Sequence, residues 1–247
     1  MDISKIQPIS NQPALMIHDK KILVIADLHI GIESELREYG VNASSQTEKM
    51  LDNLKNICKK YEPEKIVLLG DIKHNIPTST ISERRDVKNF LKKTTKLAQV
   101  HIVVGNHDGF IKKLSPENIK IHPSNGFTIE NIGFIHGHSW PKEEIMLCDQ
   151  IIMAHTHPTI MLTDRLEHRS FESCWIDAKP DKQKISEKYK IDKNPKILIM
   201  PAFNPLCGGT AINKDGITGP LSKLIDIPKS SIYLLDGTSL GTVKSIK

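Results

Sequence analysis

The stretch Val100-His101-Ile102-Val103-Val104-Gly105-Asn106-His107-Asp108 joins a mostly apolar run directly to a polar tetrapeptide. A short, nearly continuous apolar run predicts a strand that is buried on both faces of its sheet. Similar runs lie at 22–26, 66–69, 133–135, 151–153 and 197–200. Apolar residues at helical spacing separate the first three runs in chain order, so we expect an α/β domain that begins with a βαβαβ unit.

Two segments between these runs have the spacing of a capping box, in which side chains at both ends satisfy free N–H groups of the first helical turn. They are Ser45-Gln46-Thr47-Glu48 and Thr80-Ile81-Ser82-Glu83. Each predicts the start of a helix that covers the sheet. From about residue 120 the pattern changes to short strands and turns, with hairpins expected at 127–135 and after Ser231.

Polar clusters follow the carboxyl ends of five of the runs. They are Asp27-Leu28-His29, Gly70-Asp71-Ile72-Lys73-His74, Gly105-Asn106-His107-Asp108, His136-Gly137-His138 and His155-Thr156-His157. One such cluster alone is most often a turn or an exposed strand end. Seven of the eleven histidines lie in these clusters, however, and open α/β sheets build their sites at this edge. We therefore expect one shared site.

The side chains of this expected site are carboxylates, imidazoles and one amide, a mixture that suits Mn²⁺, Fe²⁺ or Zn²⁺. The four cysteines are scattered, so reduced thiols are expected and a thiol-bound structural zinc is not. Two cations about 3.5–4 Å apart need a ligand that bridges them. Asp71 is the residue that we expect in that role.

The ordered motifs resemble those of the calcineurin-like metallophosphoesterases: Asp-x-His, Gly-Asp, Gly-Asn-His-Asp, a strand-end His and a final His-x-His. The resemblance covers residues 22 to about 160 and departs at Ala154, where that family usually has Gly. It implies a four-layer αββα sandwich, with two central mixed β-sheets flanked by helices. It also implies two divalent metal ions, Mn²⁺ being the first expectation, with the ligands Asp27, His29, Asp71, Asn106, His136, His155 and His157.

The same resemblance implies roles for the remaining polar residues of the clusters. His107 would lie over the scissile phosphate as a catalytic group, and Asp108 would orient His107. His136 is expected to be the ligand in its cluster because it directly ends the strand, whereas His138 would contact substrate.

Two spacings, Asp-x-His-x-Gly at 27–31 and Gly-Asp-x-x-His at 70–74, are similar to the nuclease branch typified by SbcD and Mre11. The chain is identified as a member of an SbcD/Mre11-related archaeal phosphoesterase family. This implies that His74 is a second catalytic histidine and that the enzyme hydrolyses phosphodiester bonds, with DNA as a candidate substrate. The alternatives are a phosphodiesterase or phosphatase for a nucleotide-sized substrate, and a non-catalytic scaffold like the retromer subunit VPS29.

The amino-acid composition is that of a folded protein, but it does not identify a ligand. The net charge of +5 at pH 7 would attract a phosphate-bearing ligand, although a lysine-rich surface gives the same sum. The charged segment 163–196 is expected to form a surface excursion or lid of a single domain over 1–247, with Arg165 and Arg169 as substrate contacts. No run is long enough to span a membrane and no leader is expected, so the predicted location is cytoplasmic. The oligomeric state stays open between a monomer and a homodimer.

Overall fold

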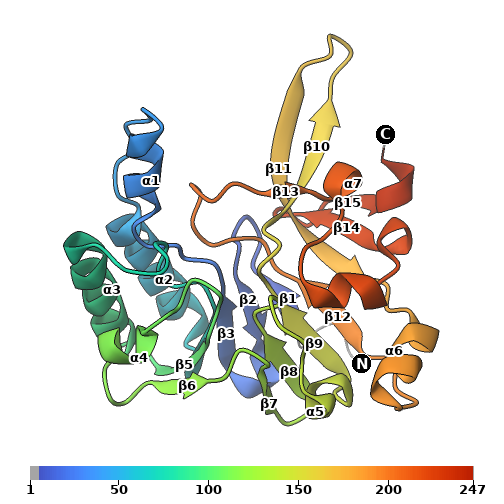
Figure 1. Ribbon diagram of the computed structural model, residues 1–247, viewed down its shortest axis with the longest axis horizontal. Helices are drawn as coiled ribbons and strands as arrows, with labels where there is room; N and C mark the ends of the chain where they lie inside the picture. The colour runs from blue at the N-terminus through green and yellow to red at the C-terminus, as the bar shows by residue number, and fades with distance from the viewer. Residues whose placement is uncertain (1–5, 247) are drawn as a thin grey trace.

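A computed structural model describes residues 6–246 of the chain. Two β-sheets face each other, and helices lie on the outer side of each sheet (Figure 1). The core between the sheets contains side chains from both of them, including Val24 and Val67 from the first and Phe134, Ile152 and Trp175 from the second. The expected αββα sandwich with two mixed sheets is therefore confirmed.

The first sheet has the strand order β1-β2-β3-β4-β5-β6. Strands β3 to β6 run parallel, whereas β1, β2 and β3 pair antiparallel. The bounds are β1 Ile6–Pro8, β2 Leu15–Ile17, β3 Ile22–Ile25, β4 Lys65–Leu69, β5 Gln99–Val103 and β6 Lys120–His122.

The second sheet has the order β13-β10-β11-β12-β9-β8-β7, and β14 pairs with β11 and with β15. Strands β8, β9 and β12 are parallel neighbours. The bounds are β7 Phe127–Ile129, β8 Ile132–Ile135, β9 Gln150–Met153, β10 Pro158–Thr163, β11 Arg169–Ala178, β12 Lys196–Ile199, β13 Thr210–Ala211, β14 Ser231–Leu234 and β15 Ser239–Thr242. All six apolar runs are strands whose ends agree with the expectation to within one residue, and both expected hairpins are present.

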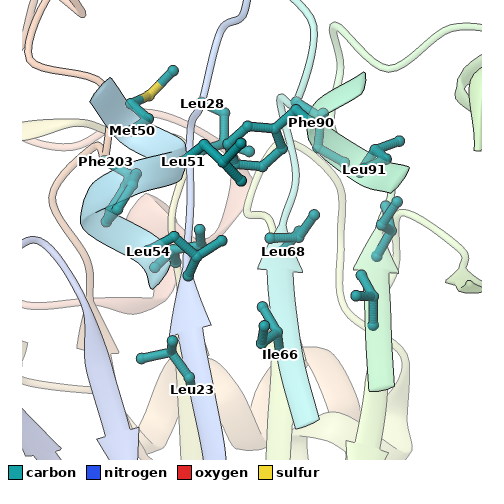
Figure 2. Close-up of a cluster of buried hydrophobic side chains, with 14 of the residues drawn as sticks. Leu23, Leu28, Met50, Leu51, Leu54, Ile66, Leu68, Phe90, Leu91 and Phe203 are labelled. Carbon is teal, nitrogen blue, oxygen red and sulfur yellow. The ribbon is translucent and has the colours of Figure 1, made fainter. Parts of the chain in front are cut away.

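Helices α2 (Thr47–Tyr61) and α3 (Ile81–Thr94) cover the outer face of the first sheet. Their apolar sides pack onto the strands, as Figure 2 shows for Leu51, Leu54, Phe90, Leu23 and Leu68. The shorter α-helices are α1 Ile32–Glu38, α4 Ile111–Leu114, α5 Glu143–Met146, α6 Lys182–Tyr189 and α7 Ile212–Asp215. The described residues also form 3₁₀ turns at His18–Lys20, Pro220–Leu224, Ile227–Lys229 and Val243–Ser245.

The two predicted capping boxes have different outcomes. Thr80 caps α3: its hydroxyl accepts the Glu83 N–H, and the Glu83 side chain accepts the Thr80 N–H. The prediction at Ser45 is wrong, because α2 begins at Thr47 and its N-cap residue, Gln46, makes no side-chain capping bond. The Ser45 hydroxyl instead bonds to Thr47, and a buried Glu33 carboxylate accepts the Gln46 N–H.

The segment 163–196 contains regular elements of the second sheet. Strand β11 pairs with β10, β12 and β14, and its residues Cys174, Trp175 and Ile176 are fully buried. Only the outer part of the β10–β11 hairpin projects from the body (Figure 1). Within residues 6–246, no helix is long and apolar enough to cross a membrane.

Candidate metal and catalytic site

The five polar clusters meet where the carboxyl ends of β3, β4, β5, β8 and β9 come together. The Asp71 Oδ2 atom lies 3.5 Å from His29 Nε2 and 3.2 Å from His136 Nε2. The Asp27 Oδ1 atom lies 3.3 Å from His157 Nε2. Side chains from both sheets therefore share one site.

The backbone at these strand ends is unusual. Five of the seven expected ligands have a positive φ, between 39° and 70°: Asp27, His29, Asp71, His155 and His157. Residues other than glycine rarely adopt this conformation, and it persists where the surrounding structure imposes it. The sharp turn after each strand directs these side chains into the common site.

Asp71 belongs to two groups of potential ligands, one on each side of its carboxylate. Ligand atoms of Asp27, His29 and Asp71 all lie within 4.8 Å of one another, and so do those of Asp71, His136 and His155. The second Asp71 oxygen, Oδ1, accepts the His107 N–H at 2.8 Å. Burial opposes ionisation, but the His136 hydrogen bond and the nearby imidazoles outweigh burial and hold the Asp71 pKa well below its usual range. Asp71 is therefore a carboxylate at neutral pH.

The first group has the features of a cation site. Asp27 is fully buried, and its Oδ1 atom has no hydrogen-bond partner among residues 6–246. The Nε2 atoms of His29 and His157 face each other at 3.3 Å, and His157 Nδ1 donates to the Gly208 carbonyl. Burial lowers the pKa of His29 to about 3, so its imidazole is neutral. A buried orphan oxygen beside inward-facing imidazole nitrogens is a donor set that fits a divalent cation.

The second group contains Asp71, His136 and His155, and Asn106 lies beside His136. His136 Nδ1 donates to the Leu69 carbonyl at 2.8 Å, which directs Nε2 toward Asp71 and places it 3.2 Å from Asn106 Oδ1. The bond from Nδ1 to the Leu69 carbonyl fixes the tautomer that a metal-binding imidazole needs, with Nε2 as the atom that would bind the metal. His138 lies farther out, with its ring 5.2 Å from the His136 ring and 6.0 Å from the His155 ring. Within the described chain, only His136 of the two belongs to a group of potential ligands.

His74 and His107 lie side by side next to the first group, with ring centroids 5.5 Å apart. His107 Nδ1 donates to the His74 carbonyl, so His107 Nε2 is left for substrate. His74 Nε2 donates to the Glu35 carboxylate of α1, and His74 Nδ1 lies 3.2 Å from His29 Nδ1. With these tautomers, the chain from Glu35 through His74 to His29 leaves His29 Nε2 free to bind a cation.

Glu83 holds the segment that carries His74. Its Oε1 atom accepts the N–H groups of His74 at 2.7 Å and Asn75 at 2.8 Å. Its Oε2 atom accepts the Thr80 N–H and the Asn75 side chain. The buried capping glutamate of α3 is thus also a positioning residue for the site.

Asp108 does not orient the His107 ring as expected. Its buried carboxylate instead accepts the N–H groups of Ile72 at 2.8 Å and Gly105 at 2.9 Å. Burial, together with the charge of Asp71, raises the Asp108 pKa to about 6. Asp108 therefore joins the loops after β4 and β5. A carboxylate at a strand end can accept hydrogen bonds from backbone N–H groups as readily as from an imidazole N–H.

The structure adds a loop that the sequence pattern did not reveal. Cys207 Sγ lies within 4.8 Å of ligand atoms of His29 and His157, and Asn204 Nδ2 donates to the Leu28 carbonyl. This loop follows β12 and carries no Asp or His, so no strand-end signal marks it. Cys207 is a further candidate ligand on this side of the site.

Arg165 and Arg169 are not brought to the site. Both are exposed on the projecting β10–β11 hairpin, and in residues 6–246 neither side chain makes a hydrogen bond or an ion pair. Their neighbour His168 bonds to Asp164 within the same hairpin. The structure therefore gives these arginines no contact with the histidine clusters.

Comparison with known proteins agrees with this site. The model of the calcineurin-like phosphoesterase family matches residues 20–199, which include every strand-end cluster. A solved structure of the nuclease MPE from Pseudomonas putida has 20% sequence identity and a TM-score of 0.56, covering 94% of this chain and 97% of that chain. At this identity the likeness shows a common fold.

A second solved structure, of Yfce, a phosphoesterase from E. coli, has 13% identity and a TM-score of 0.41, covering 89% of this chain and 96% of that chain. The family match spans most of the chain, and the clustered His and Asp side chains fit a metal site for phosphoester hydrolysis. The chain belongs to the calcineurin-like phosphoesterase family.

Proposed function

We propose that this protein is a phosphodiesterase with two divalent metal ions, Mn²⁺ being the preferred metal, and that its substrate is a nucleic acid. The observation that carries the proposal is the shared position of Asp71, whose Oδ2 atom lies 3.5 Å from His29 Nε2 and 3.2 Å from His136 Nε2. A carboxylate between two sets of ligands is what a two-metal site requires.

The residues would divide into two sets around this bridge. Asp27, His29 and His157 would hold one ion, and Asn106, His136 and His155 the other, with Asp71 shared. Bound there, divalent cations supply Lewis acidity toward the phosphoryl oxygens and lower the pKa of water. The buried, preoriented ligands keep these charges in place without reorganisation.

The chain's own proton-transfer group is His107. Its Nδ1 atom is held by the His74 carbonyl, which leaves its Nε2 atom available to substrate, and its backbone N–H donates to Asp71 Oδ1. From there it donates a proton or a hydrogen bond to the leaving oxygen. His74 supports diester cleavage in the manner of the SbcD/Mre11-related enzymes, because it stacks beside His107 and is held by Glu35 and Glu83.

The test is hydrolysis of bis-p-nitrophenyl phosphate, a diester, against p-nitrophenyl phosphate, a monoester, with Mn²⁺ and with EDTA. We expect Mn²⁺-dependent turnover of the diester and a loss of about 10²–10⁴-fold in His107→Ala, the usual contribution of a general acid. Exposed His18, which bonds to Gln7 far from the site, provides a matched control in His18→Ala.

The results separate the alternatives. Loss of diester but not monoester turnover in His74→Ala supports the nuclease-like assignment, whereas a wild-type preference for the monoester indicates a phosphatase for nucleotide-sized substrates. Absence of metal-dependent turnover on both substrates would overturn the proposal in favour of a scaffold.

A further inference from the structure

A basic cavity adjoins the segments that carry the two catalytic histidines. It has a volume of about 380 Å³, and its lining includes Ser79, Arg84, Lys88, Phe110, Lys113 and Leu114. One wall is formed by residues between His74 and the middle of α3. The other wall is formed by residues between His107 and the end of α4. Since adjacent Cα atoms are about 3.8 Å apart, the Phe110 Cα atom lies within ~11 Å of that of His107. The cavity is therefore within reach of a substrate bound at the histidines.

The three cations of the cavity are not neutralised. In residues 6–246, Arg84, Lys88 and Lys113 form no ion pair, and each is exposed. The Arg84 guanidinium donates twice to the Ser79 carbonyl, at 3.0 and 2.8 Å, which fixes the arginine at the cavity.

Two other cations of α3 form ion pairs, whereas exposed Lys92 forms none within residues 6–246. Arg85 pairs with Asp86, and Lys93 pairs with Glu48. Arg84 and Lys88 stand four residues apart, on one side of the helix, where like charges repel and destabilise it. An unpaired, repelling pair at a cavity beside the site is explained if an anion occupies the cavity.

Phe110 supplies an aromatic surface next to these charges. Its side chain is 68% exposed, and its φ is 64°, a conformation that bulky residues seldom adopt. The Lys113 ammonium lies 5.1 Å from the ring centroid. An exposed phenyl ring on a strained turn, flanked by cations, is suited to stack on a flat ring that carries negative charge nearby.

We propose that this cavity, with Arg84, Lys88, Phe110 and Lys113, binds the single-stranded nucleic acid that flanks the scissile phosphate. The inference rests on the proposed phosphodiesterase function and names its substrate class. Unpaired cations contact the backbone phosphates, and Phe110 stacks on a base, the combination that binds single strands without sequence preference. A base in DNA or RNA offers the same π-face.

The test is binding of fluorescent 12-nucleotide single strands, one DNA and one RNA, followed by anisotropy. All proteins carry His107→Ala and are loaded with Mn²⁺, so that cleavage does not interfere. We expect Phe110→Ala to weaken binding at least about fivefold, the lower range for loss of one stacked base. Replacement of Arg84, Lys88 and Lys113 by Ala should reduce the slope of log K against log salt by about 2, because each single-strand phosphate contact contributes about 0.7.

Matched controls lie on other elements, namely β11, α7 and two of the 3₁₀ turns. Phe171 of β11 is also an exposed phenylalanine, so Phe171→Ala should bind as the parent protein does. A triple change of exposed Lys214, Lys223 and Lys244 to Ala removes the same charge elsewhere, and it should leave the salt slope unchanged.

Diester turnover with His107 intact separates this inference from the function on which it rests. Cavity variants should hydrolyse bis-p-nitrophenyl phosphate like the wild type, because this small substrate does not reach the cavity. If oligonucleotide binding depends on Phe110 but no diester is hydrolysed, the phosphodiesterase function is refuted and nucleic-acid binding at the cavity is supported. If the cavity variants bind both strands as the parent protein does, the cavity is not a binding site, and the proposed function still stands. The same conclusion follows if the cavity variants and the control variants lose turnover and binding equally.

Discussion

Gly105 packs so closely against Asp71 that a Cβ atom on Gly105 would lie 2.1 Å from Asp71 Oδ1 and 2.3 Å from the Asp71 backbone nitrogen. The glycine of the Gly-Asn-His-Asp motif is thus required by the neighbouring strand end, which carries the shared carboxylate. We expect Gly105→Ala to displace Asp71 and to lower Mn²⁺-dependent diester turnover by at least about 100-fold, since small displacements at a reacting site have this effect.

Gly109 provides the control for that experiment, because within the described part of the chain a Cβ atom there would meet nothing within 4 Å beyond its chain neighbours. Turnover of bis-p-nitrophenyl phosphate and Mn²⁺ affinity by calorimetry should be near wild type in Gly109→Ala. Wild-type turnover in Gly105→Ala would contradict the role given to this contact.

Glu83 and Thr80 form the same capping box, but only Glu83 also holds His74. Thr80→Ala and Glu83→Ala should each destabilise the protein by about 1 kcal/mol or more, as expected for loss of a helix cap. Urea unfolding measures this effect. Diester turnover should fall substantially only in Glu83→Ala, because its loss frees the His74–Asn75 backbone; similar turnover in both variants would show that Glu83 acts only as a cap.

Metal removal should destabilise the protein, because Asp27 and Asp71 are buried carboxylates close to each other. Mn²⁺ at 100 times its Kd should stabilise the folded state by about 2.7 kcal/mol relative to EDTA. Thermal unfolding at several Mn²⁺ concentrations measures this shift. In Asp71→Asn the dependence on Mn²⁺ should be largely lost, and an unchanged dependence would refute Asp71 as a ligand.

The lowered pKa of buried His101 should make the free energy of unfolding of the metal-free protein, measured in EDTA, depend on pH. Its ring stacks on His122, with Nδ1 of His101 3.0 Å from Nε2 of His122. Burial, with His122, Lys120 and Lys65 nearby, lowers the His101 pKa to about 4. Its ordinary value is about 6.5. Between these values the unfolded chain binds more protons, so the free energy of unfolding falls as pH decreases from about 6.5 to about 4.

Replacement of His101 by Gln should therefore flatten the pH dependence of urea unfolding over that interval. His168→Gln, a change of an exposed histidine on the β10–β11 hairpin, serves as the comparison. An equal slope in His101→Gln and the wild type would show that protonation of His101 does not contribute to acid sensitivity.

The sequence by itself determined the strands and the polar residues that end them. Periodicity and short apolar runs are local signals, so the ends of β3, β4, β5, β8 and β9 could be located from them. The cap of α3 was equally local, because Thr80 and Glu83 lie within one turn. The start of α2 was missed because Glu33, 13 residues earlier in the chain, bonds to Gln46 in place of a local cap.

Only the tertiary structure decided which of these groups meet. Long-range pairing places β11 inside the second sheet, although its charged sequence resembles a surface segment. It also brings Cys207 to His29 and His157, directs Asp108 to backbone donors, and leaves Arg165 and Arg169 on a projecting hairpin. A sequence specifies where each strand ends, but contacts between ends depend on strand order and crossovers, which nonlocal packing of the whole chain determines.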